Sequence, residues 1–266
     1  MNIGRLLSSR RWRLASGIVL FAYLVTHFFN HMLGLVALEA AEAGLTWSIA
    51  FWHSWPGTIL LYGAATLHFS LALTTLYMRR EWKLPAIEYL RLWAGFSLPL
   101  LLIGHAATAR LGVSLHETVP TYANTVASII SGGTQEKQLV LLAPGWVHGG
   151  LGLWISLRRS ALMRRLKFLL LGALVCVPLL SAAGFISMGR ELVHRGLATP
   201  PAAATRYIAA APVKGPAPPF DAAKAVRAEE LRRWKDGLTN AYLALIAAAL
   251  LIGPLRRAAV RRIAPL

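Results

Sequence analysis

The stretch SGIVLFAYLVTHFFNHMLGL, residues 16–35, decides the fold class because it contains no charged side chain. An apolar stretch of about twenty residues is long enough to cross the hydrocarbon core of a bilayer as an α-helix. Five similar stretches follow, so we predict an all-α membrane protein with a single membrane domain, residues 1–266. Its first four spans are expected to form an up-down four-helix bundle. The six predicted spans are about 14–38, 55–78, 92–111, 139–157, 168–189 and 238–255.

The composition excludes a soluble enzyme. Hydrophobic residues make up 56% of the 266 residues and charged residues only 15%, whereas soluble domains carry about 25% charged residues. Cys176 is the single cysteine, which excludes a disulfide within the chain and a cysteine-bound iron–sulfur cluster. The chain has no C-x-x-C-H run, so any haem is expected to be held without thioether bonds.

The net charge of +17 is concentrated between alternate apolar stretches. An excess of Lys and Arg marks cytoplasmic loops, so we predict a multi-pass protein of the bacterial inner (plasma) membrane with both termini in the cytoplasm. The basic flanks are expected to contact anionic lipid headgroups. Because no basic stripe is interleaved with aromatic residues, nucleic acid is not an expected partner. The basic clusters are residues 5–13, 79–91, 158–167 and 256–262.

The predicted outer links differ in character. Residues 112–138 show little pattern and predict an irregular loop with one short helix. The link between spans five and six contains a Pro/Ala-rich loop, residues 196–220, which is expected to be extended or poorly ordered. After it, Asp221 is a candidate helix cap and Gly237 a candidate stop. The segment between these two residues either lies on the outer membrane surface or forms a charged helix leading into span six.

Four histidines lie inside the first four spans, where an imidazole is energetically costly and needs a partner. His27 and His105 each follow an arginine by fourteen residues, Arg13 and Arg91 respectively. His68 and His148 precede the basic ends of their spans by eleven and ten residues. In an up-down bundle these matched depths pair His27 with His105 and His68 with His148 across the two diagonals.

Two imidazoles at one depth are the ligand set of a b-type haem, so the pairing predicts two haems b. Iron with two nitrogen ligands from the protein has no open position, so it transfers electrons and does not activate oxygen. The spacing to the arginines implies a depth difference of only about 5 Å between the pairs. His31 is therefore kept as an alternative ligand to His27, and a single haem on His68 and His148 remains an alternative. The plainer interpretation is hydrogen bonding to a neighbouring helix.

Other polar residues have weaker assignments. Arg110 is a candidate partner for a haem propionate, although its plainer role is to end span three. Asn30 and His31 are candidate hydrogen-bond donors to a quinone at the outer haem. His53, His116 and His194 lie in or near outer loops, and no ligand spacing supports metal binding by them.

The first four histidine segments resemble a known membrane module. SGIVLFAYLVTHFFNHMLGL (16–35), LYGAATLHFSLAL (61–73), LPLLLIGHAATAR (98–110) and PGWVHGGLGLWISLR (144–158) are similar to the six-helix, succinate-dehydrogenase-cytochrome-b-like anchor of certain bacterial class III adenylate cyclases. GFISMGRE (184–191) fits its fifth helix.

The resemblance implies a di-haem, quinone-linked redox module that regulates or anchors a cyclase. It also implies ligand roles for His27, His68, His105 and His148. Ferredoxin-like and cyclase domains usually follow in that family, and this sequence contains neither. We therefore expect either the anchor portion of a longer protein or a stand-alone relative.

Two other classes compete with this reading. A haem-free anchor would only position or dimerise a signalling partner, as a homodimer for example, and would be colourless. A transporter is favoured by broken helices and repeated halves, and in the sequence we identify no internal repeat.

Overall fold

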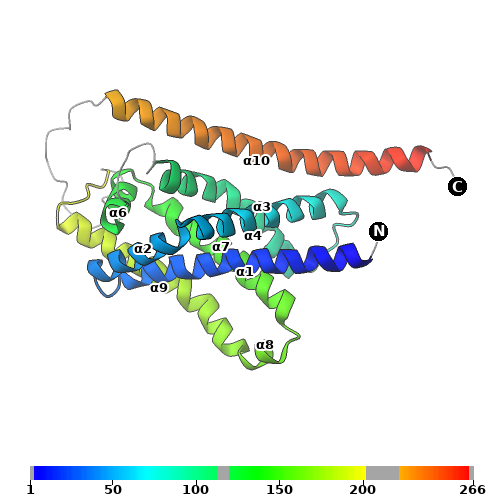
Figure 1. Cartoon of the computed structure of the whole chain (residues 1–266), viewed down its shortest axis with the longest axis horizontal. Coiled ribbons are helices and arrows are strands. Elements are labelled where there is room, and N and C mark those ends of the chain that lie inside the picture. The colour runs from blue at the N-terminus through cyan, green and yellow to red at the C-terminus, as the bar shows by residue number, and fades with distance from the viewer. Residues whose placement is uncertain (1–2, 113–119, 202–221, 264–266) are drawn as a thin grey trace.

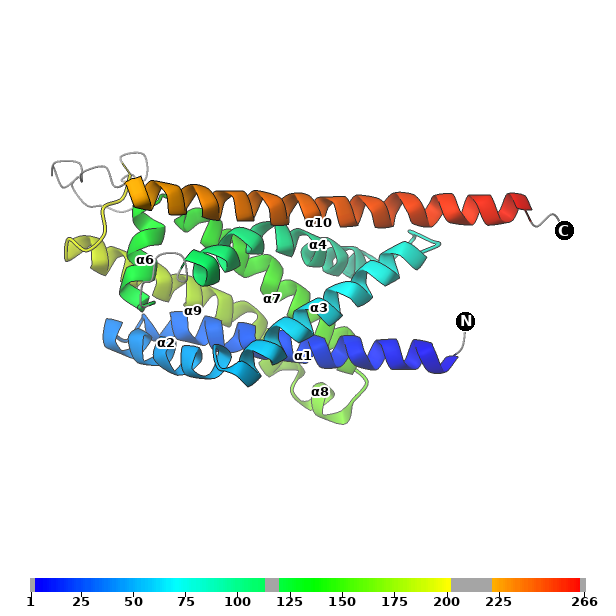
Figure 2. The same ribbon diagram turned by 45° about the horizontal axis from the view of Figure 1, so that its top comes forward.

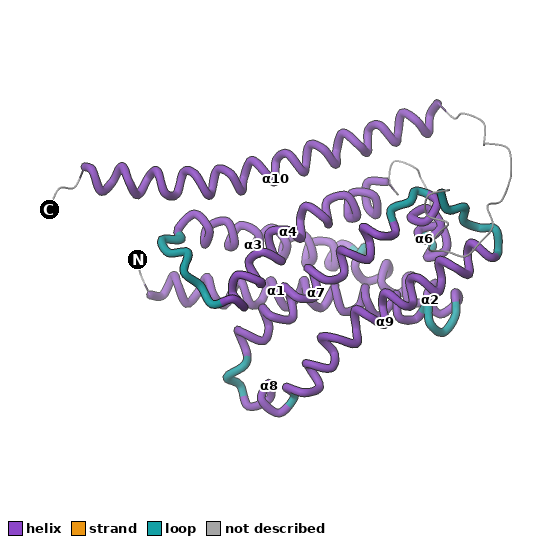
Figure 3. The backbone as a smooth tube through the Cα atoms, turned by 180° about the vertical axis from the view of Figure 1, so that it is seen from behind, coloured by secondary structure: helices purple, strands orange, loops and turns teal. Residues whose placement is uncertain are grey.

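The computed structural model describes residues 3–112, 120–201 and 222–263, and this part of the chain is helical without any strand (Figure 1; Figure 3). Six of its helices are long and apolar enough to cross a membrane, which confirms the predicted all-α fold class. The elements in chain order are α1 (Ile3–Leu33), α2 (Leu38–Trp52), α3 (Trp55–Met78), α4 (Ala86–Ala107), the π-helix η1 (Thr108–Gly112), α6 (Tyr122–Ser131), α7 (Gln135–Leu157), α8 (Ala161–Arg165), α9 (Lys167–His194) and α10 (Ala222–Ile263).

The four histidine-bearing helices α1, α3, α4 and α7 form the centre of the molecule. Helix α1 packs against α3 and α7, and α4 packs against α7. Between α3 and α4 lies α10, which contacts both. Consequently α1 and α4 occupy one diagonal of the bundle, and α3 and α7 occupy the other.

Helices α9 and α10 cover opposite grooves of this bundle. Helix α9 packs against α1 and α7, and Ser181 on α9 donates a hydrogen bond to the Phe28 carbonyl at 3.0 Å. Helix α10 lies along α3 and α4 (Figure 2), where Tyr242 contacts the Phe69 ring and donates to the Phe96 carbonyl. Each of these two grooves is thus covered by one additional helix.

The chain termini and the α3–α4 link lie at one end of the bundle, and α2 and α6 lie at the other (Figure 1). We call these the terminal end and the α6 end. The largest cluster of buried apolar side chains is at the α6 end, where α2, α6 and α9 meet around Val126, Ile130 and Leu192. Thr121 caps α6 by accepting a hydrogen bond from the Asn124 amide. The α6 end is therefore a packed cap over the bundle.

Several predicted segments differ from the structure. The first span ends at Leu33, and residues 38–52 form a separate helix, α2. The short helix expected within residues 112–138 is α6, and α7 begins at Gln135, before the predicted start of the fourth span. Gly237 does not stop a helix, because α10 is continuous for 42 residues and includes the charged segment before the apolar span. That result favours the charged helix leading into span six, while Asp221 and most of the Pro/Ala-rich loop lie outside the described residues.

Candidate functional site

The structure brings the four span histidines together in two pairs. The ring centres of His68 and His148 are 6.1 Å apart, and those of His27 and His105 are 5.7 Å apart. Two imidazoles that bind one metal ion, each at a metal–nitrogen distance of about 2 Å, have ring centres about 6 Å apart. Both pairs therefore have the spacing that two axial ligands of one haem iron require.

Three of these imidazoles are held by a hydrogen bond at Nδ1. His148 Nδ1 donates to the Arg91 carbonyl at 3.0 Å, and His105 Nδ1 lies 2.7 Å from Oε1 of Gln138. His68 Nδ1 lies 3.1 Å from Oγ of Ser16, whose own proton is directed to the Trp12 carbonyl. These partners are hydrogen-bond acceptors, so the ring proton sits on Nδ1 and the lone pair on Nε2. In metal sites, a histidine ligand usually makes such a second contact, which sets its tautomer and orientation.

The two pairs are well separated along the bundle, and the expected depth difference of about 5 Å is wrong. The His68 ring packs against Gly17 on α1, where an added Cβ would lie 3.3 Å from His68 Cε1. His27 is ten residues further along the same helix, so the pairs are about 15 Å apart at a rise of 1.5 Å per residue. Helix α4 repeats the relation, because His148 packs against Gly95, ten residues before His105.

The expected depth difference was wrong because Arg13 and Arg91, the residues from which it was counted, do not mark the ends of the bundle. Arg13 is eleven residues into α1, and its Nη1 donates to Thr75 Oγ1 on α3 at 2.8 Å. Arg13 and Arg91 are half-buried between helices, whereas the arginines that follow α7, Arg158 and Arg159, are exposed. A separation of about 15 Å between centres removes the crowding that had favoured His31 as the outer ligand.

We predicted no internal repeat, but alignment of the paired histidines reveals one. Aligning His27 with His105 matches RLASGIVLFAYLVTH (13–27) to RLWAGFSLPLLLIGH (91–105), with identical Arg, Leu, Gly and His positions. Aligning His68 with His148 matches Leu61 to Leu141 and Leu71 to Leu151. The pair α1 and α3 therefore corresponds to α4 and α7.

This correspondence explains the pairing of the histidines. Exchanging α1 with α4 and α3 with α7 also exchanges the groove covered by α9 with the groove covered by α10. Each histidine pair thus consists of equivalent residues from the two halves of the repeat.

His31 lies next to His27 but faces different neighbours. Its ring is 4.8 Å from His27, packs edge-on to Phe185, and has Nδ1 2.9 Å from the Tyr122 hydroxyl. Burial, with the nearby Glu42 carboxylate as a second cause, raises the pKa of Tyr122, so the phenol keeps its proton and can donate it to His31. Asn30, the other candidate quinone donor, instead faces Gly44 on α2, so the two residues do not share a site.

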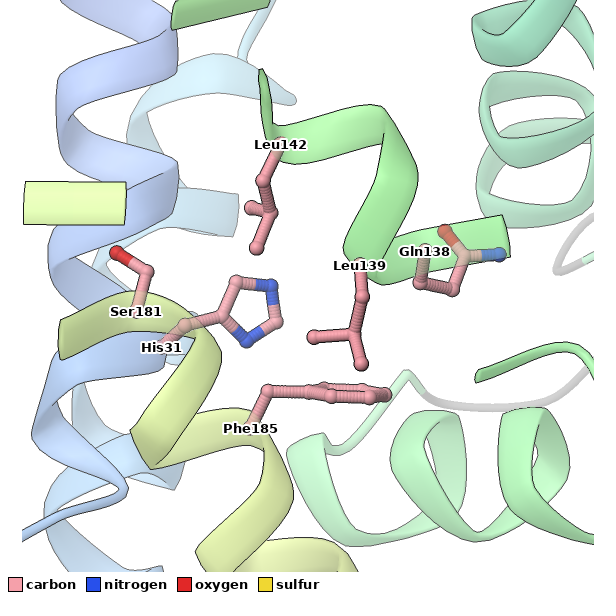
Figure 4. Close-up of a pocket in the computed structure, with 6 residues that line it drawn as sticks. All are labelled: His31, Gln138, Leu139, Leu142, Ser181 and Phe185. Carbon is pink, nitrogen blue, oxygen red and sulfur yellow. The ribbon is translucent and has the colours of Figure 1, made fainter. Parts of the chain in front are cut away.

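A cavity of about 20 Å³ lies beside His31, between α1, α7 and α9. In Figure 4 the His31 imidazole points into this space from α1, with Phe185 below it and Gln138 at the far side. A space of this size holds about one water molecule. The remaining lining residues are Leu139, Leu142 and Ser181.

Arg110 lies in η1 and points toward α3. It donates to Thr58 Oγ1 at 3.1 Å and its guanidinium is 5.7 Å from the centre of the Tyr62 ring. Burial lowers the pKa of His53, and the positive charge of Arg110 lowers it further. His53 and His194 are exposed, as expected for loop histidines, and His116 lies outside the described residues.

The donor set suits a metal that brings most of its own ligands. Among residues 3–112, 120–201 and 222–263, no group of three or more His, Cys, Asp or Glu side chains is placed to hold a metal ion. A porphyrin supplies four nitrogens and needs only two from the protein, and the two imidazole pairs fit that requirement. Comparison with protein families, with functionally characterised proteins and with solved structures finds no match for this chain.

Proposed function

We propose that this protein is a b-type membrane cytochrome that binds two haems, one at His68 and His148 and the other at His27 and His105. The observation that carries this proposal is the pairing of imidazoles at 6.1 and 5.7 Å, with Nδ1 of His68, His105 and His148 engaged and Nε2 left for a metal. Imidazoles inside a membrane bundle need partners, and a haem iron would supply one for Nε2 of each ring.

In such a cytochrome, residues of this chain would orient the histidine rings and leave space beside them. When bound, the haems supply one-electron oxidation and reduction. Ser16, Gln138 and the Arg91 carbonyl hold three of the imidazole rings in orientation. Gly17 and Gly95 leave space against the rings of His68 and His148. Each histidine pair would supply two nitrogen ligands to a haem, so a bound haem would serve electron transfer and would not offer iron an open position for a substrate.

We infer that the electron donor or acceptor at the α6 end is a quinone of the bacterial inner membrane. His31 supports this, because its ring centre is 4.8 Å from that of His27 and its imidazole offers a hydrogen-bonding group beside the His27–His105 pair (Figure 4). The resemblance to cyclase anchors extends the proposal to a redox input for a cytoplasmic signalling partner, a cyclase or ferredoxin-like domain. Under this proposal the terminal end of the bundle faces the cytoplasm.

Spectroscopy of the purified protein tests the proposal. The reduced-minus-oxidised spectrum should show b-type haem at two per chain. His68→Ala and His105→Ala should each remove one haem and leave the other, because the two histidines belong to different pairs. His194→Ala is the matched control, since His194 is exposed at the end of α9 and both haems should remain.

A colourless wild-type protein that still folds would contradict the proposal and favour the haem-free anchor. Loss of both haems in each single variant, with the helical content unchanged, would contradict the assignment of two independent pairs. Circular dichroism separates these results from simple misfolding.

A further inference from the structure

Two arginines converge beside the His68–His148 pair. Arg13 on α1 and Arg91 on α4 occupy equivalent positions in the internal repeat, four residues before Gly17 and Gly95. Gly17 packs against the His68 ring and Gly95 against the His148 ring, so each arginine lies about one helical turn from a histidine of the pair. The repeat therefore places two like charges at one level of the bundle.

Among the hydrogen bonds and ion pairs of the described residues, the two arginines have only one carboxylate partner. Arg91 Nη2 pairs with Glu88 at 2.9 Å, but Nε of Arg91 is buried without a hydrogen-bond partner among the described residues. Arg13 donates to the neutral Thr75 hydroxyl. Two guanidinium groups in a medium of low dielectric constant repel strongly unless an anion lies between or beside them.

Snorkelling toward lipid headgroups does not account for these two side chains. Arg158 and Arg159, which follow α7, are exposed, as snorkelling arginines are. Arg13 and Arg91 lie within the candidate membrane-spanning helices and are half-buried. The Arg13 side chain donates to Thr75 on α3, and the Arg91 side chain pairs with Glu88 on its own helix. A haem held by His68 and His148 would bring its own carboxylates, which such guanidinium groups could bind.

We propose that Arg13 and Arg91 form a two-arginine site for the propionate carboxylates of the haem held by His68 and His148. The inference rests on the proposed function. Guanidinium groups bind carboxylates through paired, charge-assisted hydrogen bonds, and Nε is one of the donors of that fork. Such a site would hold the propionates near Arg13 and Arg91 and would make reduction of the haem easier, because positive charge stabilises the added electron.

A cycle of protein and cofactor variants tests this site. Apo-protein with the wild-type sequence, Arg13→Gln, Arg91→Gln or Arg10→Gln is loaded with haem b or with its dimethyl ester, in which both propionates are neutral. The midpoint potentials of both haems and the resonance Raman bands of the propionates are measured. Arg10 is the matched control because it is one turn from Arg13 on α1 and exposed.

The expected result is a lower midpoint potential for one haem in Arg13→Gln and Arg91→Gln with haem b, with shifted propionate bands and two haems retained. With the dimethyl ester, the same substitutions should have little further effect, because the propionate charge that they contact is gone. Arg91→Lys should restore part of the potential. Arg10→Gln should leave both potentials unchanged.

Three outcomes would overturn the proposal. Substitution effects of equal size with haem b and with the ester would show that the arginines act on something other than propionate. Effects that disappear when anionic phospholipid is replaced by neutral detergent would assign the site to a lipid phosphate. Unchanged potentials in both variants would show that the two arginines bind no cofactor group. If wild-type protein took up no haem, the proposed function itself would fall, and this inference with it.

Discussion

At the scale of single residues, the side chains around the histidines matter as much as the histidines. His105 is oriented by Gln138 and His68 by Ser16, and neither partner is recognisable from the sequence as part of a site. An amide or a hydroxyl on an apolar helix has many uses. Its role becomes visible only when the residue that it contacts, 33 or 52 positions away in the chain, is known.

Replacing Gln138 tests this orienting role. In Gln138→Leu the Nδ1–H of His105 loses its acceptor, so the affinity of the His27–His105 site for haem should fall by about 10- to 100-fold. The affinity is measured by titrating haem into the apo-protein. Gln135→Leu is the control on the same helix, because the buried Oε1 of Gln135 has no partner among the described residues.

Equal affinity in wild-type protein and Gln138→Leu would contradict the orienting role. A fall of the same size in Gln135→Leu would attribute the loss to the helix and not to His105. Only a selective effect at position 138 supports the assigned contact.

At the scale of the elements, glycines set how closely the bundle helices approach. A Cβ on Gly95 would lie 2.5 Å from His148 Cε1, closer than side chains pack, while Gly104 on the same helix has open space around it. One glycine therefore makes room for an imidazole, and the other does not contact anything that an added methyl group would displace.

The pair Gly95→Ala and Gly104→Ala separates these roles. Gly95→Ala should destabilise the protein by about 1–3 kcal/mol, because the methyl group displaces a ring held by the Arg91 carbonyl. Gly104→Ala should be neutral or stabilising by up to about 1 kcal/mol, as expected for alanine in a helix. Thermal unfolding in detergent measures both, and equal effects would contradict the close contact at Gly95.

At the scale of the whole molecule, the bundle is a two-fold repeat closed by two unlike helices. Helix α10 reaches its groove after the link that includes residues 202–221, and Tyr242 connects it to both α3 and α4. The contacts that hold α10 are therefore side-chain contacts within the groove. We expect the covalent link only to keep α10 near this groove.

Dividing the chain tests that view. Residues 1–201 and 222–266, produced as two chains in the same cells, should copurify and retain the haem spectrum of the intact protein. Tyr242→Ala in the smaller fragment should reduce the copurified amount, because the Phe69 contact and the hydrogen bond to Phe96 are lost. Complete separation of fragments that are each inserted in the membrane would show that the link holds α10 in place.

The sequence alone determined the helical class and the approximate position of each span, because hydropathy is a local property of the chain and a bilayer selects for length. It also singled out the four histidines, since a polar ring in an apolar span is conspicuous wherever it points. The internal repeat was present in the sequence too, but spread over two separate helix pairs, and it became evident only when His27 was set against His105.

The tertiary structure decided how deep each site lies and what surrounds it. Depth across a bundle depends on how neighbouring helices are shifted along one another, and that shift is set by contacts such as Gly17 with His68 and Arg13 with Thr75. Counting residues from flanking arginines cannot recover it, because Arg13 bonds to Thr75 inside the bundle and Arg91 is half-buried. The physical reason is that spacing along one helix carries no information about its displacement relative to the next.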